Sequence, residues 1–430
     1  MGDQVVFTEY NGTEERFVMP DDVTEVAEGA FAKNKSLRHV DLRNVRRIGT
    51  SAFQDCSNLE SVVMSKVTVI DPLAFEFCRS LRTVVIGDIT DVGERAFFCC
   101  SLLDIPQLPR SIRSVGSGAF SHTSIRRADL HWLSEIPSYL FSSCNALAYA
   151  DISGAREIGA EAFSGCGALT RVLYDAAEKI GAKAFYRCDA FIVSRLPDGL
   201  REIGDDAFSS IQNGLTVPGN VEAIGRNCFG PADRKKSIRI YRPALYELRN
   251  YFKDDRTDPE YEDDHFYLWE SSIDITVLDE QTDEVIGLLP LYSDFDPYLR
   301  SALAEAFRED NTFDYTILDT VIFDGMKWNQ RCKDKQAVTR IKFPYGLSDT
   351  AREQYDGYLH RHFGRMAQRA LRDRDIDMLA FMCEHDLIGE ENITEIIDSS
   401  ISLAAPECTA FLLERQAESG WHGDPLLDEL

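Results

Sequence analysis

An Ala-Phe pair that recurs about every 22 residues constrains the fold of this chain more than any other feature. Leu140 and Cys228 replace the alanine in two of the ten slots. Because a fixed step of this length is typical of stacked repeats, we expect one small unit repeated ten times. The phenylalanines of the ten slots are Phe31, Phe53, Phe75, Phe97, Phe120, Phe141, Phe163, Phe185, Phe208 and Phe229.

The rest of each unit predicts a strand and a corner. In residues 44–64, NVRRIGTSAFQDCSNLESVVM, the end of the unit reads L-x-x-V-x-M. Alternate residues of a strand face opposite sides, so Val62 and Met64 should point inward and Val63 outward. L-x-x-L-x-L at a period of 20–29 is the leucine-rich repeat pattern. Gly49 suits a tight corner where φ is positive.

Six cysteines stand three residues after the phenylalanine of their unit. Free cysteine is among the most buried residue types, and neither C-x₂-C spacing nor clustered histidine accompanies these cysteines. We therefore expect a buried ladder of small residues, one per coil, in which these six are free thiols, and no metal site or redox array. The six are Cys56, Cys78, Cys100, Cys144, Cys166 and Cys188.

The pattern A-F-x-x-C-x-x-L-x-x-V-x-L, followed by V/I-x-x-I-G, resembles the BspA-type leucine-rich repeats over residues 17–240. The resemblance implies an α/β repeat solenoid of about ten coils of 22 residues. It also implies a binding module without a fixed catalytic residue, as on bacterial surface adhesins. Asn11-Gly12, between Val5–Phe7 and Arg16–Met19, predicts a β-hairpin that caps the first coil.

The period stops near residue 240, so three regions are predicted. Residues 1–240 form the capped repeat domain, and 241–330 form an α+β connecting region with a hairpin of Ser272–Leu278 and Glu284–Tyr292. Residues 331–430 form a helical domain that is only loosely ankyrin-like, because T-P-L-H is absent. Its expected helices include 349–363, 365–372, 375–384, 391–402 and 407–418. A further helix is expected at 297–308.

The net charge of −26 is uneven. Residues 1–240 hold 27 basic and 31 acidic residues, a net charge of −4, and 241–430 hold 19 and 41, a net charge of −22. The second half should repel nucleic acid, and it favours a basic partner if it binds one.

Neither a signal peptide nor a membrane span is expected, and eleven cysteines suit a reducing compartment. The sequence as it stands therefore predicts a cytoplasmic protein. The cell surface is the alternative location, if a leader has been removed or export is unconventional.

The sequence predicts no catalytic residue, cofactor or metal. G-x-S-x-G, P-loop and H-E-x-x-H motifs are absent. His360 and His362 are two apart on an expected helix and so point to different faces. The principal hypothesis is a non-catalytic protein-interaction module. The alternatives are an enzyme with its chemistry in residues 265–363, for which a pocket with converging polar groups would argue, and an exported adhesin.

The candidate partner-binding surface is the outer face of the stacked strands. Exposed apolar side chains on one face are typical of partner sites, and Tyr149 is the best single anchor. The alternative is that the second half of the chain covers this face. The candidate residues are Val63, Val85, Ile105, Arg127, Tyr149, Asp151, Arg171 and Leu173.

Overall fold

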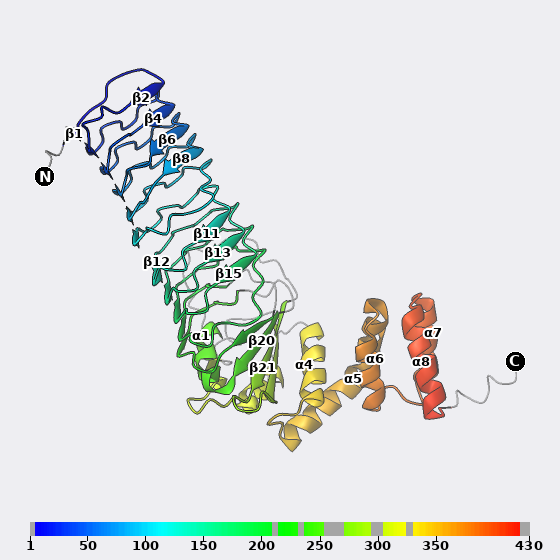
Figure 1. Ribbon diagram of the computed structural model, residues 1–430. Helices are drawn as coiled ribbons and strands as arrows, with labels where there is room; N and C mark the ends of the chain where they lie inside the picture. Colours follow the sequence, from blue (N-terminus) through cyan, green and yellow to red (C-terminus); the bar gives the residue numbers. More distant parts are fainter. Residues whose placement is uncertain are drawn as a thin grey trace. The chain divides into compact units, whose positions relative to one another are not determined.

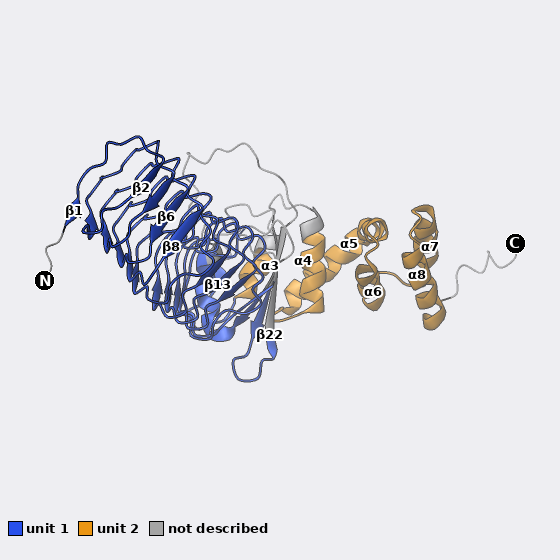
Figure 2. Cartoon of the chain, turned by 45° about the horizontal axis from the view of Figure 1, so that its top comes forward, with its two compact units in different colours: residues 1–289, 295–313 blue, residues 290–294, 314–430 orange. Residues whose placement is uncertain are grey.

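The computed structural model describes residues 5–208, 214–230, 236–252, 271–293, 304–323 and 330–421. The chain divides into two compact units (Figure 2). The first comprises residues 1–289 and 295–313, and the second comprises residues 290–294 and 314–430.

The first unit contains the expected solenoid of parallel strands (Figure 1). Its longer strands form two sheets, each built from successive coils in parallel register. The first sheet contains β2 (Arg16–Val18), β4 (His39–Asp41), β6 (Ser61–Met64) and β8 (Thr83–Ile86). The second contains β11 (Arg127–Asp129), β13 (Tyr149–Asp151) and β15 (Arg171–Leu173).

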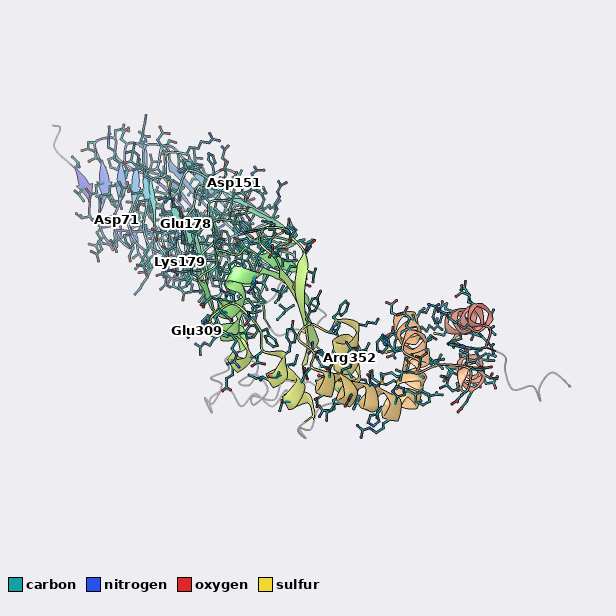
Figure 3. All side chains as sticks on the ribbon, turned by 90° about the horizontal axis from the view of Figure 1, so that it is seen from below. Asp71, Asp151, Glu178, Lys179, Glu309 and Arg352 are labelled. Carbon is teal, nitrogen blue, oxygen red and sulfur yellow. The ribbon has the colours of Figure 1, made fainter. Side chains whose placement is uncertain are left out.

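Most coils also contain a second strand of two residues, and these short strands form separate sheets. The sequence did not suggest these sheets. In Figure 3, Asp151 on β13 lies apart from Lys179 on β16 and from the adjacent Glu178. One such sheet contains β1 (Val6–Phe7), β3 (Glu25–Val26), β5 (Arg47–Ile48), β7 (Val69–Ile70), β9 (Asp91–Val92) and β10 (Ser114–Val115). The other contains β12 (Glu135–Ile136), β14 (Glu157–Ile158), β16 (Lys179–Ile180), β17 (Glu202–Ile203) and β19 (Ala223–Ile224).

Close contact between coils explains the glycine that follows several of the short strands, for example Gly49 after β5 and Gly159 after β14. The expectation of a positive φ at Gly49 is wrong. A β-carbon there would lie 2.7 Å from the carbonyl oxygen of Val26 in the preceding coil, and one on Gly159 would lie 2.4 Å from the Ser138 nitrogen. Positive φ values occur instead two residues before and after the phenylalanine, for example at Ser51 and Asp55.

A continuous column of phenylalanine rings fills the centre of the solenoid, as predicted. From Phe31 to Phe208 the rings are almost fully buried. Neighbouring centroids are 4.6–5.8 Å apart, and neighbouring ring planes are within 23° of parallel. The Ala-Phe period therefore places one ring per coil in a single dry core.

The cysteine ladder is also confirmed, since all six thiols are buried and free. Each Sγ–H donates to the phenylalanine carbonyl of the preceding coil, for example Cys166 to Phe141 at 3.1 Å and Cys188 to Phe163 at 3.1 Å. The thiols thus satisfy buried carbonyl groups, as small side chains with a weak donor can.

The predicted N-terminal hairpin is wrong. β1 pairs in parallel with β3, and β2 pairs in parallel with β4, so the segments on either side of Asn11-Gly12 belong to different sheets. The first coil therefore repeats the path of the later coils. The turn signal is local, whereas stacking on the next coil buries the apolar side of both strands.

A four-stranded sheet begins within the last coils and has the order β18 (Leu215–Val217), β20 (Lys236–Tyr241), β21 (Ser271–Leu278) and β22 (Val285–Ser293). β21 and β22 are neighbours joined by a turn in which the Asp279 amide donates to the Glu284 carbonyl at 2.9 Å, so the predicted hairpin is present. The 3₁₀ helix η1 (Arg242–Leu248) and α1 (Arg249–Phe252) follow β20 in the chain.

The second unit is helical. Its described helices are α3 (Tyr315–Phe323), α4 (Gln330–Lys342), α5 (Asp349–Asp373), α6 (Ile376–Glu384), α7 (Ile393–Ser402) and α8 (Pro406–Ser419). The expected break between 363 and 365 is wrong, because α5 continues through Gly364, where glycine costs only about 1 kcal/mol relative to alanine. The helix expected at 297–308 lies mostly outside the described residues.

A buried ion pair joins three of these helices. Arg340 on α4 donates to both carboxylate oxygens of Asp319 on α3, at 2.8 and 2.9 Å. The Tyr355 hydroxyl on α5 donates to the same carboxylate at 2.8 Å. In the described part of the chain, the helices are not long and apolar enough to cross a membrane.

Candidate functional site

Five of the eight predicted surface residues lie together on β11, β13 and β15. The parallel register places Tyr149 between Arg127 and Arg171 in one row. The next row contains Asp151 with Leu173 on one side. The two arginines are exposed, and the other three side chains are half-buried. The 22-residue period determines this grouping, since equivalent positions of successive coils become strand neighbours.

Tyr149 is held within its row by a cation–π contact. The guanidinium carbon of Arg127 lies 4.4 Å from the centroid of the Tyr149 ring. Such a contact fixes a large aromatic ring on a partly exposed surface without burying it. The row therefore presents an oriented aromatic side chain flanked by positive charge.

Val63 and Val85 lie on the other long-strand sheet. They are direct neighbours in the register of β6 and β8, and Val85 is 46% exposed. Val18, which sequence reasoning did not select, is 50% exposed on β2 of the same sheet. Val63 and Val85 make a small apolar pair on a different sheet from the row around Tyr149, and Asp41 lies between Val63 and Val18 in the register.

Ile105 was predicted to point outward, and this is wrong: it is buried, with 4% of its surface exposed. Residues 101–110 do not form a strand, and Pro106, which the pattern places inside, is exposed. The exchange is local, because Leu103 and Leu108 stay buried two repeats after Leu59 and Met64, and the two-residue alternation does not hold where the segment forms no strand. The apolar stripe is therefore interrupted between β8 and β11.

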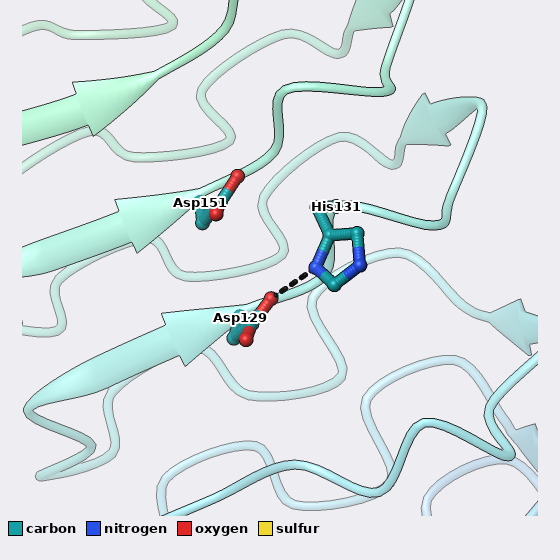
Figure 4. A group of neighbouring side chains, drawn as sticks. All are labelled: Asp129, His131 and Asp151. Atoms are coloured by element: carbon teal, nitrogen blue, oxygen red, sulfur yellow. Dashed lines mark hydrogen bonds and ion pairs between the residues drawn. The ribbon is translucent and has the colours of Figure 1, made fainter.

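A polar cluster lies at the ends of β11 and β13. Asp129 and Asp151 are direct neighbours across the two strands, and His131 Nδ1 lies 2.6 Å from Asp129 Oδ1. Figure 4 shows the imidazole beside the two carboxylates. Burial by itself would raise the pKa of Asp129, but the hydrogen bond and charge of His131 outweigh it and lower this pKa.

Sequence reasoning did not select His131. The signal was available, since D-L-H at 129–131 aligns with D-I-S at 151–153 after one repeat of 22 residues. The neighbouring ring of Trp132 packs edge-on against the imidazole at a centroid distance of 5.1 Å, and its indole N–H donates to the Ile112 carbonyl at 2.8 Å. His131 is thus positioned by a second aromatic group.

The chain is similar to several solved leucine-rich repeat proteins. A T. pallidum leucine-rich repeat protein is 28% identical, with 44% of this chain and 82% of that chain covered and a TM-score of 0.34. A leucine-rich cell surface protein of Faecalibacterium prausnitzii is 22% identical, with 53% and 80% covered and a TM-score of 0.33. The pneumococcal vaccine antigen PcpA is 16% identical, with 55% and 77% covered and a TM-score of 0.37.

No curated protein matches the chain. The model of the BspA type leucine rich repeat region matches residues 5–126, 87–191 and 178–253, in six copies. These matches run from residue 5 to residue 253, which is more than half of the 430 residues. The chain therefore belongs to the BspA-type leucine-rich repeat family.

Proposed function

We propose that this chain is a non-catalytic protein-interaction module and that a partner binds the outer face of β11, β13 and β15. The single observation that carries the proposal is the row in which Arg127 orients the ring of Tyr149 and Arg171 lies on its other side. Tyrosine and arginine are enriched at the energetically dominant positions of protein interfaces.

The chemistry of this face indicates a partner with a mixed surface. An apolar pocket on the partner would take the Tyr149 ring, and acidic groups would pair with the two arginines, which lie two strand spacings apart on either side of β13. Asp151 and Leu173 lie in the adjacent row and would contribute a polar rim and additional apolar contact. The adjacent valines Val63 and Val85 would be a secondary contact.

The enzyme alternative is less well supported. A cavity of about 240 Å³ is lined by Asp334, Lys335 and six residues between Met366 and Met378, so most of its lining is beyond the segment 265–363. The buried Asp334 carboxylate in this lining already accepts hydrogen bonds from the Tyr358 hydroxyl, Arg365 and Arg369, at 2.8–3.1 Å. Polar groups that are paired in this way stabilise helix packing rather than converge on a substrate.

A capture experiment with the full chain tests the proposal. Wild type, Tyr149→Ala and Tyr139→Ala are immobilised and exposed to lysate of the native organism. Tyr139 is a matched control because it is a tyrosine with 44% exposure outside the long-strand sheets.

We expect Tyr149→Ala to weaken capture of the bound partner by about 1–2 kcal/mol, or roughly tenfold, with an unchanged melting curve. Tyr139→Ala should capture the partner like wild type. Equal capture by all three proteins would place the contact elsewhere, or would mean that the second half of the chain covers this face.

A further inference from the structure

We propose that Asp129, His131 and Asp151 bind one divalent transition-metal ion, of the class represented by Zn²⁺, at the carboxyl ends of β11 and β13. This site shares Asp151 with the proposed partner surface but does not rest on it, and it can be measured on the protein alone.

The three side chains already have nearly the spacing of a ligand set. One ligand atom from each residue lies within 4.8 Å of the other two. In a tetrahedral zinc site with bonds of about 2.1 Å, neighbouring ligand atoms are about 3.4 Å apart. His131 Nδ1 and Asp129 Oδ1, now 2.6 Å apart, would separate by about 0.8 Å as the ion replaces their shared proton.

The side chains can make this adjustment because they are partly exposed. The exposed fractions are 38% for the His131 side chain and 24% for that of Asp129. The same exposure leaves room for a fourth ligand from solvent or from another molecule, as in zinc sites with three protein ligands.

The kinds of donor atoms select the class of metal. Two carboxylates carry the charge that neutralises a divalent cation, and an imidazole favours zinc, copper, iron or nickel. Calcium and magnesium prefer all-oxygen ligand sets, so the histidine discriminates against both. The proposal therefore predicts that Zn²⁺ binds much more tightly than Mg²⁺.

Neighbouring groups position the ligands. The backbone N–H and the hydroxyl of Ser153 both donate to Oδ1 of Asp151, at 3.2 and 2.8 Å. These two hydrogen bonds do not involve Oδ2, which can therefore bind the ion. Trp132 fixes one side of the His131 ring. Such outer contacts are typical supports of metal ligands.

The cluster is also more than a consequence of the repeat. The equivalent aspartate on β4 is Asp41, but two residues later the chain has Arg43, whose backbone N–H donates to Asp41 Oδ1 at 3.0 Å. The strand neighbour of Asp41 on β6 is Val63. Among the described long strands, two adjacent aspartates meet a histidine only at β11 and β13.

Calorimetric titration of the metal-stripped full chain with ZnCl₂ tests the proposal. The variants are His131→Ala and Asp151→Asn. The amide oxygen introduced by Asp151→Asn can still accept the hydrogen bonds from Ser153. His39→Ala is the matched control, because His39 is a half-buried histidine on the other long-strand sheet, with Nδ1 2.9 Å from the Ser61 hydroxyl. We expect each ligand variant to weaken Zn²⁺ binding at least about tenfold and the control to leave it unchanged.

Co²⁺ provides a second measurement. Wild type and His39→Ala should show the visible absorption of Co²⁺ that is bound by protein side chains, and His131→Ala should lose this absorption. Melting curves of the metal-free proteins identify any variant that fails to fold, in which case Asp151→Asn decides. Equal Zn²⁺ affinity in wild type and Asp151→Asn, or tighter binding of Mg²⁺ than of Zn²⁺, would overturn the proposal.

Discussion

Replacement of Phe163 by alanine is the most direct test of the phenylalanine column. The ring of Phe163 is completely buried, and it lies 5.7 Å from the ring of Phe141 and 5.4 Å from that of Phe185. Phe163→Ala removes the apolar burial, leaves a cavity and breaks two ring contacts. Substitutions of this kind cost about 3–5 kcal/mol.

Phe163→Leu separates the contributions to that loss. Leucine retains most of the apolar volume but makes no ring contacts, so the expected cost is about 1–1.5 kcal/mol. Leu102→Ala is the surface control, because Leu102 is 39% exposed, and a change of less than about 0.5 kcal/mol is expected there. In a stack of coils each interface depends on its neighbours, so the alanine variant should also loosen the two adjacent coils.

Urea unfolding followed by circular dichroism measures the change, since the free energy of unfolding falls linearly with urea concentration. Hydrogen exchange then locates it. The Phe163 amide donates to the Ala184 carbonyl at 2.9 Å, and it should lose protection together with the Phe141 amide, which donates to Ala162 at 2.8 Å. A loss of less than about 1 kcal/mol for Phe163→Ala, or equal losses for alanine and leucine, would refute the argument that a stacked column holds the coils together.

Two other predictions concern the contacts between coils. Gly159→Ala should lower the free energy of unfolding in urea by about 1–3 kcal/mol, because the new β-carbon would lie 2.4 Å from the backbone of the preceding coil. Gly167→Ala should be nearly neutral, because a β-carbon there has no atom within 4 Å. Equal effects of the two substitutions would contradict the explanation by close approach of the coils. Burial raises the pKa of the Cys166 thiol well above its ordinary value, so at pH 8 little thiolate forms, and iodoacetamide should alkylate the half-buried Cys99 long before Cys166. Peptide mass spectrometry over time checks this, and similar rates for both cysteines would show that the ladder is not closed to reagent.

The sequence predicted those parts of the fold that depend only on the period. Phe53, Phe75 and Phe163 recur in one slot, so stacking must place them in one column, and the same holds for the ladder that contains Cys166. The row of Arg127, Tyr149 and Arg171 follows in the same way, because residues one repeat apart become strand neighbours.

Features that depend on a local departure from the repeat or on long-range competition could not be predicted in this way. Ile105 is buried because its segment does not form the strand that the two-residue alternation assumes. The segments around Asn11-Gly12 satisfy a hairpin signal, yet they pair with the next coil, which offers each strand a buried partner. In the second unit, helix α5 passes through Gly364 because tertiary packing outweighs a weak local preference.

By itself, the sequence determined the repeat, its family and its core, because a fixed period requires equivalent residues to stack. Only the tertiary structure decided which side chains actually meet across coils. It placed the Arg127 guanidinium over Tyr149, and it brought His131 to the two aspartates. Both contacts depend on side-chain rotamers at the surface, where solvent and neighbouring side chains, not the repeat pattern, select the conformation.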